Sequence, residues 1–171
     1  MIIKPPIARI TKIGILALLL FSLSSSGLSA APPPDSIDAV QALLPDSVSL
    51  AGKVVYVDFW ASWCVPCRHS FPWMQKIYEK YHDKGLEIIA VNVDKEFKAA
   101  GKFLQDTKPT FQIVYDSTGT LAEQYSLEVM PTSFIYDRTG KLVSSERGFR
   151  DYKADSLDTA ILELLNARSS K

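Results

Sequence analysis

The eight residues 53–60, KVVYVDFW, place the strongest constraint on how this chain folds. A strand with one face in water alternates apolar and polar residues, whereas this run is β-branched or aromatic almost throughout. We therefore expect a strand that is buried on both faces. Such a strand has to be covered from both sides, which favours an α/β domain with helices on both faces of a central sheet.

Helix and strand signals alternate along the rest of the chain. Apolar residues recur at helical spacing over 71–81 and stop at Gly85, a typical end of a helix. The further expected elements are a buried strand at 86–93, a helix at 95–105, a strand at 111–116 and a turn at 117–120.

The C-terminal third predicts a hairpin followed by a helix. Strands are expected at 132–137 and 142–146, with a short connection between them. The last helix is expected to take Asp155 or Ser156 as its N-cap and to bury the apolar face formed by Leu157, Ile161, Leu164 and Leu165. Strand–helix alternation that ends in a hairpin implies a mixed sheet with helices on both faces.

The N-terminus has the layout of a secretory signal peptide. Lys4, Arg9 and Lys12 are the only charged residues before Asp35, and an apolar run of about a dozen residues and then small residues follow them. A membrane-spanning helix needs roughly 20 apolar residues. We therefore expect a signal peptide over 1–30 that is cleaved, with an uncleaved membrane anchor as the alternative, and export to an oxidising compartment.

The proline-rich segment 31–36 is expected to be an extended linker, and residues 37–171 are expected to form a single folded domain. The 171 residues carry 19 basic and 19 acidic side chains. Without the three basic residues of the signal, 16 basic remain against 19 acidic, so the domain is mildly acidic. This balance argues against a nucleic-acid partner.

The chemistry concentrates in Cys64 and Cys67, the only two cysteines. A cysteine at the first turn of a helix directs its sulfur toward unpaired backbone N–H groups, which stabilise the thiolate. Cys64 is therefore the expected nucleophile. Cys67 lies one turn further along the same face and fits the resolving role, while the stiff spacer of Val65 and Pro66 influences how well each redox state fits the turn.

Four other interpretations of the cysteine pair compete with thiol–disulfide exchange. A metal site needs two more ligands, and the only histidines are His69 and His82. Haem attachment needs a histidine where Arg68 stands. An inert disulfide across so small a loop stabilises little, and two unrelated buried cysteines are the fourth alternative. Thiol–disulfide exchange is favoured, with no metal and no cofactor expected.

The segment 57–67, VDFWASWCVPC, resembles the active-site segment of the thioredoxin superfamily. Its continuation to Met74, RHSFPWM, is similar to the TlpA/ResA-type extracytoplasmic thioredoxins. The likeness runs from about Gly52 to the C-terminus, and includes Pro72 and the sequence MPTSF at 130–134, which resembles the family's cis-proline loop. It implies a thioredoxin fold.

The resemblance also implies roles for individual residues. Asp58 matches a buried aspartate that relays a proton to or from the resolving Cys67, and burial would raise its pKa. The alternative is a carboxylate at a strand edge that bonds to solvent. Pro131, in the cis form, would place backbone beside Cys64 where a substrate segment pairs with it. Trp63, Pro66 and Met130 are expected to contact substrate, and Trp60 and Trp73 are expected to serve packing.

Four positions depart from the family pattern. Many ResA-like proteins have glutamate where Ser70 stands and asparagine where Asp58 stands. Ala90 falls where thioredoxins carry the lysine partner of the aspartate, and Val129 replaces a frequent glycine.

The expected function is that of a periplasmic thiol–disulfide oxidoreductase that reduces disulfides of client proteins through Cys64 and Cys67. The resemblance implies a membrane thiol reductase as electron donor, and clients such as apocytochromes c or copper-site maturation factors. A disulfide-forming oxidase and a non-catalytic module that binds a partner or copper are the alternatives.

Overall fold

Five strands and five α-helices make up residues 33–167, the part of the chain that the computed structural model describes. The strands are β1 Val54–Trp60, β2 Leu86–Asn92, β3 Gln112–Tyr115, β4 Thr132–Tyr136 and β5 Leu142–Arg147. The helices are α1 Asp38–Gln41, α2 Val65–Tyr81, α3 Phe97–Thr107, α4 Thr120–Gln124 and α5 Ala154–Asn166, with 3-10 turns η1 His82–Lys84 and η2 Asp151–Lys153. The expected signal peptide at 1–30 lies outside the described residues.

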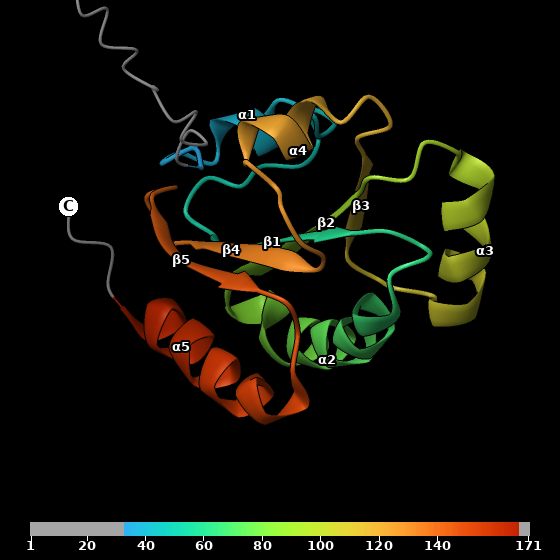
Figure 1. Ribbon diagram of the computed structural model, residues 1–171. Coiled ribbons are helices and arrows are strands. Elements are labelled where there is room, and N and C mark those ends of the chain that lie inside the picture. The colour runs from blue at the N-terminus through green and yellow to red at the C-terminus, as the bar shows by residue number, and fades with distance from the viewer. Residues whose placement is uncertain (1–32, 168–171) are drawn as a thin grey trace, which may run out of the picture.

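The strands form one mixed sheet in the order β3-β2-β1-β4-β5. β1 and β2 pair in parallel, as do β2 and β3, whereas β4 is antiparallel to both β1 and β5. Figure 1 shows α2 and α5 on one side of the sheet and α1 and α4 on the other, with α3 beyond the β3 end. The expected mixed sheet with helices on both faces is confirmed.

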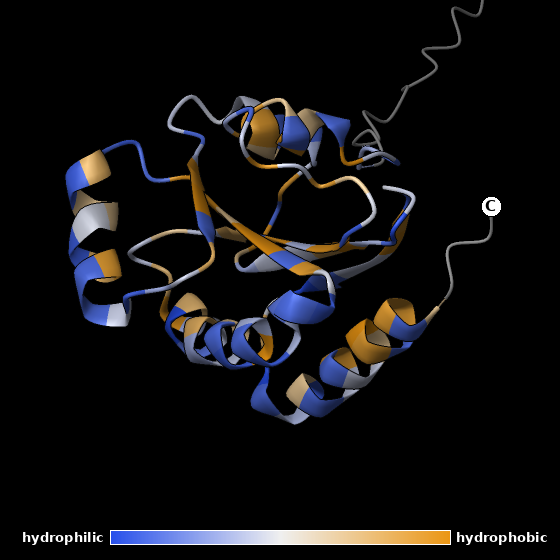
Figure 2. Cartoon of the chain, turned by 180° about the vertical axis from the view of Figure 1, so that it is seen from behind, coloured by the Kyte–Doolittle hydropathy of each residue, from blue (hydrophilic) through white to orange (hydrophobic). Residues whose placement is uncertain are grey.

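β1 is the central strand and is buried along its whole length, as its sequence predicts. Val54, Tyr56 and Trp60 point into one core with α2, α3 and α5. The alternate residues, among them Val57 and Phe59, point into a second core under α1 and α4. Figure 2 shows hydrophobic strands between helices that carry both hydrophobic and hydrophilic residues, as expected when each helix covers a sheet with one side only.

The longer elements follow the sequence expectations within a few residues, and Gly85 ends the α2–η1 segment in a left-handed conformation. The short helices α1 and α4 were not expected, because four or five residues are too few to show a helical period. The predicted N-cap of α5 at Asp155 or Ser156 is wrong. The turn η2 brings the chain into helical conformation earlier, so the N-cap is Lys153, and the Ser156 hydroxyl donates to the Lys153 carbonyl.

The described end of the proline-rich segment is attached to the β4–β5 hairpin. Ser36 forms a bridge with Lys141, and the Leu142 amide donates to the Asp35 carbonyl over 2.9 Å. The Tyr136 hydroxyl also donates to the Pro34 carbonyl. These bonds occupy backbone groups that the outer edge of β5 would otherwise leave unpaired.

Within residues 33–167, no helix combines the length and the apolar character that crossing a membrane requires.

Arg138, in the hairpin connection, ties three distant parts of the chain together. Its guanidinium donates to the carbonyl oxygens of Gly52 at 2.8 Å, Lys84 at 3.0 Å and Leu165 at 2.9 Å. The guanidinium is planar and has five N–H donors, so it can bond at once to carbonyl groups that precede β1, precede β2 and lie near the end of α5. The loops at this end of the sheet therefore depend on a single side chain.

We expect Arg138→Ala to lower the free energy of unfolding by about 2 kcal/mol, because charge-assisted hydrogen bonds are lost and three carbonyls lose their donor. Urea unfolding followed by circular dichroism measures the change. Arg150→Ala is the control, since this exposed arginine forms no side-chain hydrogen bond within the described chain. Equal stability of the two variants would contradict the role of Arg138.

Candidate active site

The two cysteines lie where β1 ends and α2 begins. Cys64 has extended backbone angles and is the N-cap of α2, and its sulfur accepts a hydrogen bond from the Cys67 amide at 3.2 Å. Pro66 occupies the first turn, where its missing N–H costs no helical hydrogen bond. The sulfur thus takes the place of a capping oxygen at the positive end of the helix dipole, which favours a thiolate at Cys64 when the pair is reduced.

The structure holds the pair as a disulfide, with 5.3 Å between the two Cα atoms. Cys67 is fully buried, whereas Cys64 keeps 4% of its surface exposed. A partner sulfur can therefore reach Cys64 and not Cys67. This asymmetry agrees with the predicted order of attack, in which Cys64 reacts first and Cys67 resolves.

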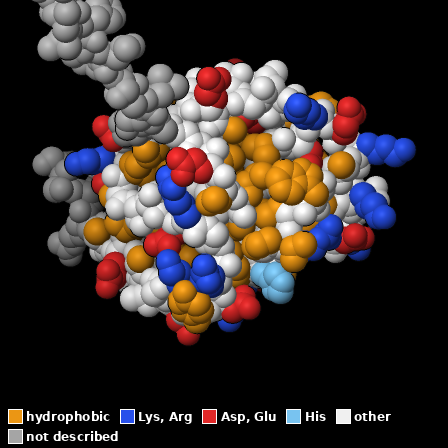
Figure 3. Space-filling model, viewed as in Figure 1, with side chains coloured by type: hydrophobic (Ala, Val, Ile, Leu, Met, Phe, Trp, Pro, Cys, Tyr) orange, Lys and Arg blue, Asp and Glu red, His pale blue; other side chains and the backbone are white. Residues whose placement is uncertain are grey.

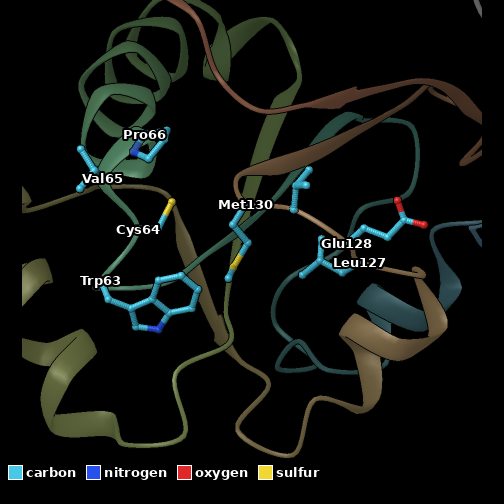
Figure 4. A pocket seen from close by; sticks show the side chains of 8 residues that line it. Trp63, Cys64, Val65, Pro66, Leu127, Glu128 and Met130 are labelled. Carbon is cyan, nitrogen blue, oxygen red and sulfur yellow. The ribbon is translucent and has the colours of Figure 1, made fainter.

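Cys64 opens into a pocket of about 530 Å³. Figure 4 shows Trp63, Val65 and Pro66 on the α2 side and Leu127 and Met130 across from them. Trp63 is 67% exposed and stands free at the rim. The lining is apolar apart from Glu128, whose carboxylate points away from Cys64 in Figure 4 and pairs with Arg147.

The far wall of the pocket is the loop before β4, and its Met130–Pro131 peptide bond is cis, as expected. The Thr132 hydroxyl donates to the Val129 carbonyl at 2.7 Å, and the Gly148 amide donates to the Pro131 carbonyl at 2.7 Å. These bonds fix the loop from both sides, which leaves a preformed wall beside Cys64. Val129 also lines the pocket, so its side chain occupies space that a glycine would leave open.

Asp58 is buried in the middle of β1, with 1% of its surface exposed. The alternative of a solvent-bonded carboxylate at a strand edge is therefore wrong. Strand alternation turns Asp58 to the same face as Tyr56 and Trp60, which belong to the core that contains Cys67. Its Oδ2 accepts no hydrogen bond from the described residues, and burial raises the pKa of the carboxyl well above its ordinary range.

A second buried carboxylate, Asp94, positions the active-site loop, and the sequence analysis missed it. Asp94 accepts hydrogen bonds from the Ser62 amide at 2.9 Å, the Ser62 hydroxyl at 3.1 Å and the Asn92 side-chain amide at 2.8 Å. Arg68 donates to the Ser62 carbonyl at 3.0 Å. The backbone two residues before Cys64 is thus held through its donor and its acceptor. The only sequence signal was a polar pair at the end of a buried strand.

Two of the positions that depart from the family pattern, Ser70 and Ala90, place an uncharged side chain where the relatives have a charged one. Ser70 is buried, and its hydroxyl donates to the Cys67 carbonyl. Ala90 is the neighbour of Asp58 on β2, so no basic group stands at that position. Trp60 is fully buried against Phe71 and Phe103, and Trp73 packs on Tyr56, in line with the packing roles expected of them.

Across residues 33–167, no three His, Cys, Asp or Glu side chains come together in a way that could hold a metal ion.

Comparison with known proteins finds relatives that are named thiol–disulfide oxidoreductases. The thiol-disulfide oxidoreductase ResA of Bacillus cereus (strain ATCC 10987 / NRS 248) is 36% identical over 97 residues, which are 57% of this chain and 56% of the relative. ResA of Bacillus subtilis (strain 168) is 34% identical over 99 residues, 58% of this chain and 55% of the relative. The chain therefore spans about half the length of the curated relatives it matches.

Solved structures extend the likeness over most of the domain. A protein from Chlorobium tepidum, described as a thiol:disulfide interchange protein DsbE, is 44% identical with a TM-score of 0.67 and covers 68% of this chain and 83% of its own. StoA from Bacillus subtilis is 28% identical with a TM-score of 0.56 over 64% of this chain and 82% of its own. The expected thioredoxin fold is confirmed. Since the pattern of the Redoxin family matches residues 41–161, the chain belongs to that family.

Proposed function

We propose that the chain is a thiol–disulfide oxidoreductase that reduces disulfides of client proteins. The observation that carries the proposal is the Cys64 sulfur at the N-terminus of α2, bonded to a buried Cys67 and open to an apolar pocket beside a cis-proline loop. A helix N-terminus supports the attacking thiolate, and the pocket offers an extended segment a place to lie. Relatives and structural neighbours named for thiol–disulfide chemistry support the same reaction.

The reaction transfers two electrons from the reduced pair to a client. The Cys64 thiolate attacks one sulfur of the client disulfide, that S–S bond breaks, and the first client sulfur leaves as a thiolate that takes up a proton from solvent. A mixed disulfide now joins Cys64 to the client. Cys67 loses its proton and attacks the Cys64 sulfur, which releases the second client thiol and leaves the Cys64–Cys67 disulfide. A dithiol donor then restores the reduced pair.

Asp58 is proposed to accept the Cys67 proton in the second step. Cys67 is fully buried, so water cannot reach its thiol directly, and Asp58 faces the same core. A carboxyl with a raised pKa takes up a proton near neutral pH more readily than an ordinary aspartate.

Trp63, Pro66, Met130 and Pro131 are proposed to form the client-binding surface, because they surround Cys64 and all but the cis-proline line the pocket. The apolar lining suits an extended apolar segment next to the client cysteine, which would pair with the backbone of the cis-proline loop. Exchange itself requires neither metal nor cofactor.

The N-terminal layout and the resemblance to extracytoplasmic thioredoxins support a place in the periplasm, with the domain from residue 37 released or anchored according to how the segment 1–30 is processed. A membrane thiol reductase would supply electrons, and apocytochromes c or copper-site proteins would be the clients.

The reductase direction predicts a low reduction potential for the Cys64–Cys67 pair. We expect equilibration in glutathione buffers to give a value near that of thioredoxin, about −270 mV, because a pair that reduces client disulfides needs a potential below theirs. A value near that of DsbA, about −120 mV, would overturn this direction in favour of the oxidase.

Cysteine substitutions separate the two thiols and test for turnover. In an insulin-reduction assay, Cys64→Ser should reduce the rate to the uncatalysed background. Cys67→Ser should form a mixed disulfide that accumulates, because the resolving thiol is absent. Mass spectrometry of the trapped species checks the second outcome. Absence of cysteine-dependent turnover, together with stoichiometric metal retained by the purified protein, would instead support the binding module.

Asp58→Asn should slow resolution of the mixed disulfide by on the order of 100-fold, the usual contribution of a positioned base. The same variant should be more stable than wild type at neutral pH. Asp58 in the unfolded chain ionises near pH 3.9, whereas the folded carboxyl holds its proton to higher pH. The unfolded state of the wild type is therefore favoured as pH rises.

The stability gap between Asp58→Asn and wild type should accordingly be small near pH 4 and widen with pH until the folded pKa is passed. Urea midpoints across this range measure it. Slow resolution together with a pH-independent stability gap would show that Asp58 acts through structure and not through its proton.

A further inference from the structure

A second groove lies near the active-site loop, between the start of α2 and helix α3. We call it the α2/α3 groove, and it has a volume of about 750 Å³. Its lining residues are Ser62, Arg68, Lys98, Ala99, Lys102 and Phe103, with Glu96 and Asp106 at the two ends of α3. Ser62 lines this groove and the next residue, Trp63, lines the client pocket, so the two depressions adjoin consecutive residues of the active-site loop.

Three basic side chains line the α2/α3 groove. Arg68, Lys98 and Lys102 are exposed, and none of them forms a salt bridge within the described part of the chain. Figure 3 shows Lys and Arg side chains along the side of the molecule where Figure 1 places α3, next to the apolar surface at the centre of the view. With three basic and two acidic side chains, the α2/α3 groove carries a net positive charge, whereas the domain as a whole is mildly acidic.

Arg68 is held in position in advance. Its guanidinium donates to the Ser62 carbonyl at 3.0 Å and lies 5.2 Å from the centre of the Phe103 ring. One donated bond leaves further N–H groups of the fork for an anion. A cation fixed by two contacts loses less conformational freedom on binding a carboxylate than a free lysine does.

The spacing of the two lysines fits a short acidic motif. Lys98 and Lys102 stand one helical turn apart, so their Cβ atoms are about 5–6 Å from each other. Alternate side chains of an extended segment repeat every 6.4–6.8 Å, roughly the same distance. Glu96 and Asp106 bracket the lysines and would repel a longer run of negative charge. The groove therefore suits two carboxylates separated by one residue, not a polyanion.

We propose that the α2/α3 groove binds an acidic segment of the client, with the pattern Asp/Glu-x-Asp/Glu in extended form, while the reactive cysteine of the same client lies at Cys64. The inference rests on the proposed function, because it assigns the groove to the partner whose disulfide the pocket receives. Apolar contact with Trp63 joins the two binding regions, and the basic side chains select among clients and speed their encounter.

Matched disulfide peptides test the α2/α3 groove. Each carries one intramolecular disulfide and an arm of about six residues with Asp-x-Asp, Asn-x-Asn or Lys-x-Lys, placed before the cysteines in one set and after them in another. In one set at least, reduction of the Asp peptide should be roughly 3- to 10-fold faster than that of the Asn peptide in 20 mM salt, as two or three exposed ion pairs imply. The advantage should fall below about 2-fold in 0.5 M salt.

Lys102→Glu should remove the preference for the Asp peptide or reverse it toward the Lys peptide. Lys141→Glu makes the same charge change at an exposed site in the β4–β5 connection and should leave the preference as in wild type. Equal rates for the Asp and Asn peptides in both sets, or a preference that Lys102→Glu does not alter, would overturn the proposal.

Two further measurements separate the groove from the chemistry. Reduction of hydroxyethyl disulfide, which is neutral and too small to reach α3, reports on the proposed function alone and should be unchanged in Lys102→Glu. Calorimetric binding of the Asp peptide with its cysteines replaced by serine reports on the groove alone. Binding that Lys102→Glu weakens supports the groove even if turnover is absent, whereas no binding to wild type counts against it.

Discussion

The hydrogen bond from the Cys67 amide to the Cys64 sulfur occurs where the central strand of the sheet becomes a helix, and the site is organised around that junction. β1 lies between a parallel and an antiparallel neighbour, and both of its faces are buried, so the strand cannot shift its register without exposing a core. The carboxyl end of β1 is therefore fixed in space. Helix α2, which starts five residues later at Val65, presents its free N–H groups to the residue that caps it, and here that residue is a cysteine.

Because both faces of β1 are buried, the carboxyl group of Asp58 lies in a place that disfavours its ionised form. A strand whose every side chain is enclosed offers a carboxylate no water. Among residues 33–167, Asp58 has no basic neighbour on β2 and no donor to its Oδ2. Such a group works against folding once it ionises. A carboxyl group at this place in the sheet makes sense if it moves a proton to or from a cysteine that solvent does not reach. The protein would then give up stability for function at this site.

How far the sequence predicted the structure depended on how local each signal was. The strand at 53–60 and the capping position of Cys64 were predictable, because hydrophobic runs and helix starts are properties of neighbouring residues. Helices α1 and α4 were missed because they are shorter than the pattern that identifies a helix. The bonds between Ser62 and Asp94 join residues 32 positions apart, and no local pattern reports such a contact. The α2/α3 groove was missed for the same reason, since Arg68 and Lys102 meet only after β2 has placed α3 beside α2.

The two depressions beside Trp63 differ in what they can contribute to recognition. Apolar contact around Cys64 is non-directional, and it would accept almost any extended segment that exposes a cysteine. Such a surface gives affinity with little discrimination. The basic side chains of the α2/α3 groove can discriminate between clients whose sequences next to the reactive cysteine are alike. They also act on the rate of encounter, before any sulfur is attacked. Selectivity can therefore reside on α3 while the reaction at the end of β1 stays unchanged, since Lys98 and Lys102 make no contact with the cap at Cys64 among the described interactions.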